Sequence, residues 1–126
     1  MKKQLNKVAE FHKAFNQEDS ITTIVYPNGG YDIRHNLMKE ENEEYLEAWV
    51  KGDIIEIADA LGDQLYILCG TILKHGMQNI IEDVFDEIHR SNMSKLGENG
   101  MPLLREDGKI LKGPGYTKPE LKQFFH

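Results

Sequence analysis

The chain has 126 residues, of which 40% are hydrophobic and 29% charged, and its formal net charge is −6. This length suits one compact domain that buries roughly two-thirds of its unfolded surface. No apolar stretch approaches the ~18 residues that a membrane span requires, and the first ten residues are too polar for a signal peptide. The single cysteine, Cys69, excludes an intrachain disulfide, so we expect a cytoplasmic protein without a membrane partner.

The negative charge is concentrated in one part of the chain. Residues 32–63 contain ten acidic and three basic residues, a net charge of −7, so the remainder is close to neutral. Such a region repels a nucleic-acid backbone and attracts metal cations. The sequence also lacks a basic stripe with interleaved aromatic residues, so we expect no nucleic-acid partner.

The first half of the chain predicts two helices and a loop. Residues 5–15 show the i, i+3, i+4, i+7 apolar spacing of an amphipathic helix, and Pro, Asn and Gly at residues 27–30 predict a loop. A second helix is predicted over about residues 32–50, with Leu37, Met38, Tyr45, Ala48 and Trp49 as core candidates. Gly52 is typical of a helix C-terminus, and Asp53 of the N-cap of the next helix.

The third predicted helix, about residues 54–74, carries apolar residues around nearly its whole circumference. A helix of this kind lies at the centre of a bundle or is covered in an oligomer. A fourth amphipathic helix is predicted over about residues 77–95. These elements predict an all-α, four-helix bundle-like core over about residues 3–96, within a single domain of residues 1–126 that forms a homo-oligomer.

The C-terminal part, residues 97–126, is rich in glycine, proline and charge. Asp107-Gly108 stands between two apolar pairs and predicts a hairpin with a type I′ turn. Residues 118–125 predict one short helical turn. We therefore expect an irregular C-terminal appendage to the helical core.

Acidic residues share one face on each of two consecutive predicted helices. At about 100° per residue, the first set of three falls on one face of its helix, and the second set falls on a tighter arc of about 60°. The sets are Glu40, Glu41 and Glu44 on the second helix, and Glu56, Asp59 and Asp63 on the third. Carboxylates this close repel one another, and a divalent cation would neutralise them. All-oxygen ligands without neighbouring histidine or cysteine favour Mg²⁺ or Mn²⁺ over zinc or copper.

The same acids have structural explanations. Acidic residues commonly form the solvated face of a helix, and Glu56 with Asp53 has the pattern of a capping box. Asp59 and Asp63 are harder to explain in this way, because they lie inside an apolar helix where aspartate is a poor helix former. Their position favours a metal or phosphate role.

Three motifs resemble one superfamily. Residues 40–44, Glu-Glu-Asn-Glu-Glu, match the EExxE element of the all-alpha NTP pyrophosphohydrolases, and residues 56–59 match its ExxD element. Residues 92–95, Asn-Met-Ser-Lys, match the Asn-x-x-Lys of several relatives. Over about residues 34–116 the chain thus resembles MazG-like and phosphoribosyl-ATP pyrophosphohydrolase-like proteins. Residues 59–66 also resemble the context of the final aspartate, but with Ala60 where glutamate is expected, so the resemblance leaves open which of Glu56, Asp59 and Asp63 bind metal.

The resemblance implies a hydrolase that uses Mg²⁺, or Mn²⁺, to split a (d)NTP into (d)NMP and pyrophosphate. It implies Glu41 and Glu44 as metal ligands together with acids of the third helix, and Glu40 as the base that activates water or as a ligand of a second metal. The residues expected to bind the nucleotide triphosphate are Arg34, Arg90, Asn92 and Lys95. Superfamily members are dimers or tetramers, so a homodimer or homotetramer is expected.

Other functions stay open at this point. Within the enzyme class, phosphoribosyl-ATP is the alternative substrate. A helical module that dimerises without catalysis is the alternative outside it. A di-iron site would need Glu-x-x-His from each of two helices, and the third helix has no histidine, so this site is disfavoured.

Overall fold

A computed structural model describes residues 1–27 and 31–126, with only the backbone described for Tyr31 and Asp32. The loop predicted at residues 27–30 therefore falls mostly outside the described residues. The chain divides into two compact units, Met1–Asn79 and Ile80–His126. Within the described ranges the regular structure is helical, which confirms the predicted all-α class. None of these helices combines the length and apolar character of a membrane span.

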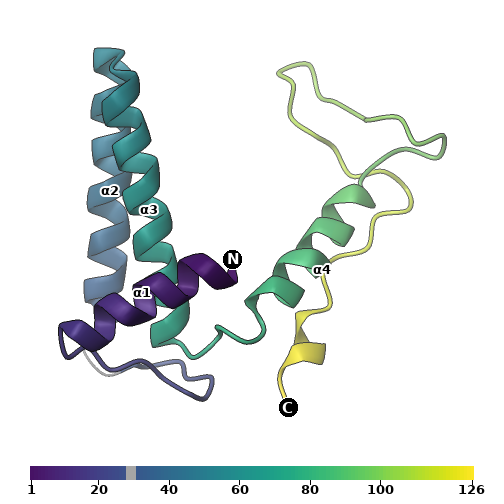
Figure 1. Cartoon of the computed structure of the whole chain (residues 1–126). Helices are drawn as coiled ribbons and strands as arrows, with labels where there is room; N and C mark the ends of the chain where they lie inside the picture. The colour runs from purple at the N-terminus through teal and green to yellow at the C-terminus, as the bar shows by residue number, and fades with distance from the viewer. Residues whose placement is uncertain (28–30) are drawn as a thin grey trace. The chain divides into compact units, whose positions relative to one another are not determined.

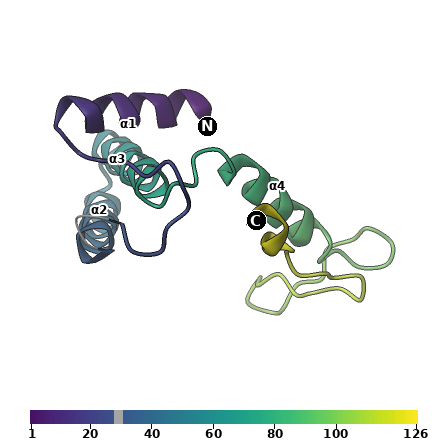
Figure 2. The ribbon, with the colours of Figure 1, turned by 90° about the horizontal axis from the view of Figure 1, so that it is seen from below.

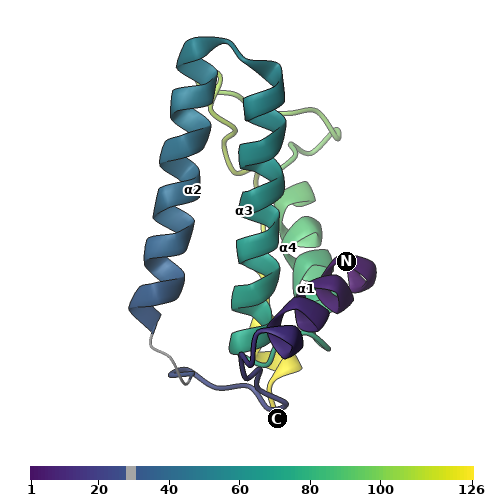
Figure 3. The ribbon, with the colours of Figure 1, turned by 60° about the vertical axis from the view of Figure 1, so that its left-hand side comes forward.

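The first unit contains helices α1 (Lys2–Ala14), α2 (Tyr31–Lys51) and α3 (Ile54–Lys74). Helices α2 and α3 run antiparallel along their whole lengths (Figures 1 and 3). Helix α1 packs across α3 on the side away from α2, so α3 lies between the other two (Figure 2). This central place agrees with the apolar residues around most of its circumference.

The turn between α2 and α3 follows from two residues. Gly52 has φ of +69°, and its N–H and that of Asp53 donate to the carbonyls of Trp49 and Ala48, a Schellman motif. The Asp53 side chain then accepts hydrogen bonds from the N–H groups of Ile55 at 3.0 Å and Glu56 at 3.1 Å. The predicted C-terminus and N-cap are confirmed, and they fix the register of the helix pair.

The core of this unit is small. Its buried apolar residues are Leu5, Val8, Ala48, Ala60, Cys69, Ile72 and Leu73. Of the core candidates on α2, Ala48 is buried, whereas Trp49 is 62% exposed, so the prediction for Trp49 was wrong. Helix α3 covers only one side of α2, and the Trp49 side chain stays largely exposed.

The second unit is built on α4 (Ile81–Met93) and a short 3₁₀ helix, η1 (Leu121–Phe124). Helix α4 is shorter at both ends than the predicted 77–95, because residues 78–80 form turns and the bonds after Met93 tighten to i→i+3. The C-terminal segment returns along α4 (Figure 1), where the N–H of Gly113 donates to the Lys95 carbonyl at 2.7 Å.

The predicted hairpin is present with a different turn. An isolated bridge pairs Leu104 with Ile110, and the N–H of Gly108 donates to the carbonyl of Arg105 at 2.8 Å. Gly108 has φ of +87°, but Asp107 does not adopt a positive φ, which a type I′ turn requires at both central residues. The loop has three residues and ends in a left-handed glycine. The type I′ prediction was wrong because glycine alone takes the left-handed conformation here.

Candidate metal centre

The antiparallel register of α2 and α3 brings the two acidic faces together. Asn42 and Gln64 mark the register, because Nε2 of Gln64 donates to Oδ1 of Asn42 at 3.2 Å. Each of the residues that precede them, Glu41 and Asp63, is shifted by only about 1.5 Å along its own helix, so these two residues lie within about 3 Å of the same level. Glu44 follows Glu41 by three residues and shares its face of α2.

Three carboxylates meet at this level. One oxygen from each of Glu41, Glu44 and Asp63 lies within 4.8 Å of the others. Glu41 and Asp63 are half-buried, whereas Glu44 is exposed. We name these three residues the acidic cluster.

Without a cation, the acidic cluster has a buried oxygen that is unpartnered within the described ranges and carboxylates that repel one another. Oε2 of Glu41 is buried and finds no hydrogen-bond partner among the described residues. Burial raises the pKa of Glu41 to about 7, and the adjacent carboxyl of Glu44 and the negative charges of Glu44, Asp63 and Asp59 add to the effect. A divalent cation bound by these oxygens would satisfy the orphaned atom and offset the repulsion. The residues present therefore fit a divalent metal.

The other predicted ligands lie outside the acidic cluster. Glu56 is exposed, and its Oε2 lies 3.5 Å from Nζ of Lys51. It does not complete a capping box, because the Asp53 N–H donates to Ala48 instead. Asp59 is exposed and acts on Glu41 through its charge, one turn before Asp63. Glu40, the predicted base, is exposed on α2 beside Glu41.

Arg34 lies on the same face of α2 as Glu41, seven residues earlier. Two helical turns separate them, about 10.5 Å along the axis at 1.5 Å per residue. Arg34 is half-buried. Burial lowers the pKa of its guanidinium, and the charge of Asp19 opposes that effect.

The three remaining predicted residues belong to the second unit. Arg90 donates to both carboxylate oxygens of Glu87, at 2.6 and 2.8 Å, and to Oγ1 of Thr117 at 2.7 Å. Its guanidinium thus fastens the C-terminal segment to α4. Asn92 is exposed and Lys95 is half-buried.

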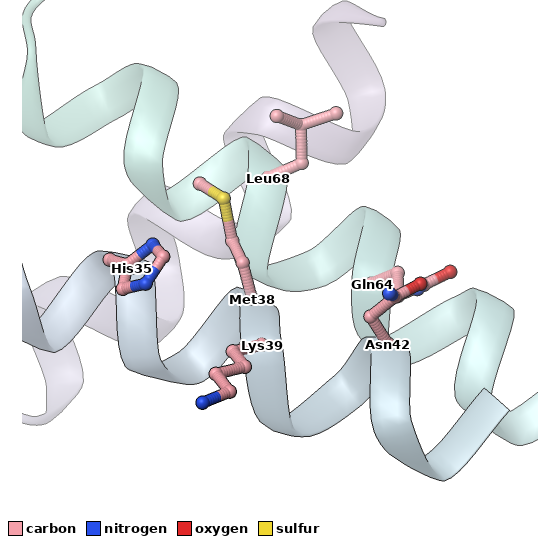
Figure 4. Close-up of a pocket in the computed structure, with 6 residues that line it drawn as sticks. All are labelled: His35, Met38, Lys39, Asn42, Gln64 and Leu68. Atoms are coloured by element: carbon pink, nitrogen blue, oxygen red, sulfur yellow. The ribbon is translucent and has the colours of Figure 1, made fainter. Parts of the chain in front are cut away.

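A pocket of about 500 Å³ also lies along α2 and α3. Its lining residues are His35, Met38, Lys39, Asn42, Gln64 and Leu68. In Figure 4, Met38 extends from α2 toward Leu68 of α3, and the amides of Asn42 and Gln64 meet. Neighbours in a helix point about 100° apart, so Asn42 and Gln64 point in different directions from Glu41 and Asp63. This pocket was not predicted from the sequence, although Asn42 lies inside the EExxE motif.

Comparison with known protein families identifies the family of the chain. The family model described as phosphoribosyl-ATP pyrophosphohydrolase matches residues 8–92, which is 85 of the 126 residues. The match contains α2 and α3 in full, with all three residues of the acidic cluster. No curated protein matches the chain with significance. The chain belongs to the phosphoribosyl-ATP pyrophosphohydrolase family, within the all-alpha NTP pyrophosphohydrolase superfamily, and is a hydrolase that acts on pyrophosphate bonds.

Proposed function

We propose that this enzyme hydrolyses the α–β phosphoanhydride of phosphoribosyl-ATP and releases pyrophosphate, with Mg²⁺ bound at the acidic cluster. The observation that carries the proposal is the meeting of Glu41, Glu44 and Asp63 around a buried carboxylate oxygen without a partner. The family match supports phosphoribosyl-ATP better than the ordinary (d)NTP favoured by the sequence motifs. The ordinary (d)NTPs stay as the second candidates, because the EExxE and Asn-x-x-Lys motifs resemble those of MazG-like proteins.

The ligand set supports the choice of metal. The cluster offers carboxylate oxygens from Glu41, Glu44 and Asp63, without histidine or cysteine. Such sites bind Mg²⁺, and Mn²⁺ can replace it. When bound, the cation supplies neutralisation of the phosphate charge and a water of lowered pKa.

Residues around the acidic cluster accept the proton of the attacking water and contact the phosphates. Water attacks a phosphorus atom of the α–β anhydride, the bond to the bridging oxygen breaks, and pyrophosphate leaves. We assign the proton of that water to Glu40, which is exposed next to Glu41 on α2. We assign a contact with the phosphate chain to Arg34, whose face of α2 carries Glu41. We also propose that Asn92 and Lys95 contact the nucleotide. Arg90 is a weaker choice for this role, because it forms an ion pair with Glu87.

The experiment that tests the proposal is a substrate panel. Phosphoribosyl-ATP, the four NTPs and the four dNTPs are incubated with the enzyme and Mg²⁺, and pyrophosphate and orthophosphate are measured separately. We expect pyrophosphate from phosphoribosyl-ATP at the highest kcat/KM. A higher kcat/KM for a (d)NTP would show that the (d)NTP, and not phosphoribosyl-ATP, is the preferred substrate. Orthophosphate as the main product would contradict cleavage of the α–β anhydride.

We also propose that the enzyme is a homodimer or homotetramer. Large apolar side chains are exposed on α2 and α3, with Trp49 at 62%, Leu61 at 49% and Leu68 at 45%. Exposed apolar area of this kind marks a surface that another chain covers. Light scattering at micromolar concentration should give at least twice the mass of one chain, and a monomer would contradict the proposal.

A further inference from the structure

Gly70 of α3 lies beside one side chain from each neighbouring helix, His12 of α1 and Arg34 of α2. It is buried in the interior of α3. Its φ is not positive, so the backbone conformation does not require glycine there. Glycine is also among the least favourable residues in a helix interior. The reason for glycine is space, because a Cβ at this position would lie 2.6 Å from Nη1 of Arg34 and 3.2 Å from Nε2 of His12.

His12 forms a fixed wall of this space. Its side chain is buried, with the residue 5% exposed, and its Nδ1 lies 2.5 Å from Oδ1 of Asp19. Asp19 in turn lies 4.0 Å from Nζ of Lys74, which donates to the carbonyl of Glu18 at 2.6 Å. The imidazole is therefore held from one side while Nε2 faces Gly70.

The guanidinium in this space keeps its donors available. Among the described side chains, no hydrogen bond or ion pair to Arg34 is formed, although the charge of Asp19 attracts it. Arg34 precedes Glu41 by seven residues on α2, and Gly70 follows Asp63 by seven on α3. Because the helices are antiparallel, Arg34 and Gly70 lie level with each other, two turns along the pair from the acidic cluster.

We infer that Gly70, His12 and Asp19 form a cradle that positions the Arg34 guanidinium for the phosphate chain of a nucleotide bound at the acidic cluster. Gly70 and His12 are positioning residues, since each acts through Arg34. The inference rests on the proposed function, in which Arg34 contacts phosphate.

Gly70→Ala tests the cradle with the smallest change. The added methyl group must move Nη1 of Arg34, the flexible end of its side chain, whereas His12 at 3.2 Å needs to shift only slightly, so the fold should survive. Gly62→Ala is the matched control, because Gly62 is in the same helix and a Cβ there meets nothing within 4 Å. Calorimetry measures the binding of Mn²⁺ alone and of tripolyphosphate in the presence of Mn²⁺. We expect Gly70→Ala to weaken tripolyphosphate binding by about tenfold, the loss of one charged hydrogen bond, with Mn²⁺ binding unchanged.

A double variant shows whether the effect passes through Arg34. In an Arg34→Ala background, Gly70→Ala should cause no further loss of tripolyphosphate affinity. In steady-state assays Gly70→Ala should raise KM and leave kcat within about twofold, which a general loss of stability would not do.

Several results would overturn the inference. One is equal tripolyphosphate affinity in Gly70→Ala and Gly62→Ala. Another is that Gly70→Ala lowers the affinity of Arg34→Ala as much as it lowers that of the parent. The third is that the parent does not bind tripolyphosphate. Hydrolysis tests the proposed function separately. A parent that binds tripolyphosphate through the cradle but releases no pyrophosphate from any nucleotide would refute the function and leave the cradle standing.

Discussion

Glu41→Gln should raise the free energy of unfolding of the metal-free protein at pH 8 and leave it unchanged below pH 4.5. Burial and the neighbouring carboxyls raise the pKa of Glu41 from 4.5 to about 7 in the folded protein. Because the folded-state pKa is the higher one, the stability associated with this group is complete below pH 4.5 and is lost as the pH rises through 7. Glutamine is neutral throughout, so the variant does not suffer that loss.

The magnitude follows from the shift and from exposure to solvent. At about 1.36 kcal/mol per pKa unit, a rise from 4.5 to about 7 corresponds to at most about 3.4 kcal/mol. Glu44 is exposed, so water screens the repulsion and about 1–2 kcal/mol should remain. Excess Mg²⁺ should reverse the order, because a ligand at 100 times its Kd stabilises the folded parent by about 2.7 kcal/mol.

Urea denaturation followed by circular dichroism measures these differences, with EDTA and with Mg²⁺. Glu43→Gln is the control, because Glu43 is exposed and lies two residues from Glu41 on another side of α2. If Glu41→Gln is no more stable than Glu43→Gln at pH 8 in EDTA, the electrostatic account of the acidic cluster is refuted.

Two further predictions concern the frame around the site. Glu87→Gln should speed hydrogen exchange in residues 113–120, because Oε2 of Glu87 accepts a hydrogen bond from the Glu120 N–H at 2.7 Å. In the control Asp86→Asn, the exchange rates should match those of the parent. The hydrogen bond from Arg90, followed by that from Glu120, lowers the pKa of Glu87 to about 2, so the parent's protection should persist at pH 4 and be lost only as the pH falls toward 2. Gly52→Ala should lower the free energy of unfolding by about 1 kcal/mol because Gly52 has φ of +69°, whereas Gly62→Ala should raise it by up to about 1 kcal/mol. Thermal unfolding of both glycine variants checks the signs, and equal effects would contradict this explanation.

Helix α3 shows what local signals can determine. Its observed bounds, Ile54–Lys74, are the predicted ones, because Gly52 and Asp53 fix the start and His75-Gly76 the end. Helix α4 has Ile80 at its N-cap, without a side-chain capping hydrogen bond, and its predicted ends at 77 and 95 extended beyond the observed Ile81–Met93. The hairpin turn was misassigned because Asp107-Gly108 fits a two-residue or a three-residue loop. The two loops differ in the φ of Asp107, and aspartate can adopt either sign of φ.

The sequence predicted which acidic residues share a face of each helix, but not which residues of α2 lie opposite which residues of α3. Helical spacing placed Glu41 with Glu44, and it grouped Glu56, Asp59 and Asp63. Only the pairing of α2 with α3 shows that Asp63 lies level with Glu41, whereas Glu56 lies beside Lys51. Spacing along one helix carries no information about its position relative to a second helix.

Arg90 illustrates a signal that was present in the sequence. Glu87 precedes it by three residues, a spacing that allows an ion pair on one helix face. The cradle around Arg34 had no such signal, because His12, Asp19 and Gly70 are brought together only by the packing of α1 against α3.

The central claim is that the acidic cluster binds the metal that the enzyme uses. Pyrophosphate release by the parent, Glu41→Gln and Glu43→Gln, measured at saturating and at limiting Mg²⁺, tests it most directly. We predict that Glu41→Gln lowers activity by at least about tenfold, with the larger loss at limiting Mg²⁺, and that Glu43→Gln matches the parent. Equal activity of the two variants at both Mg²⁺ concentrations would contradict the claim.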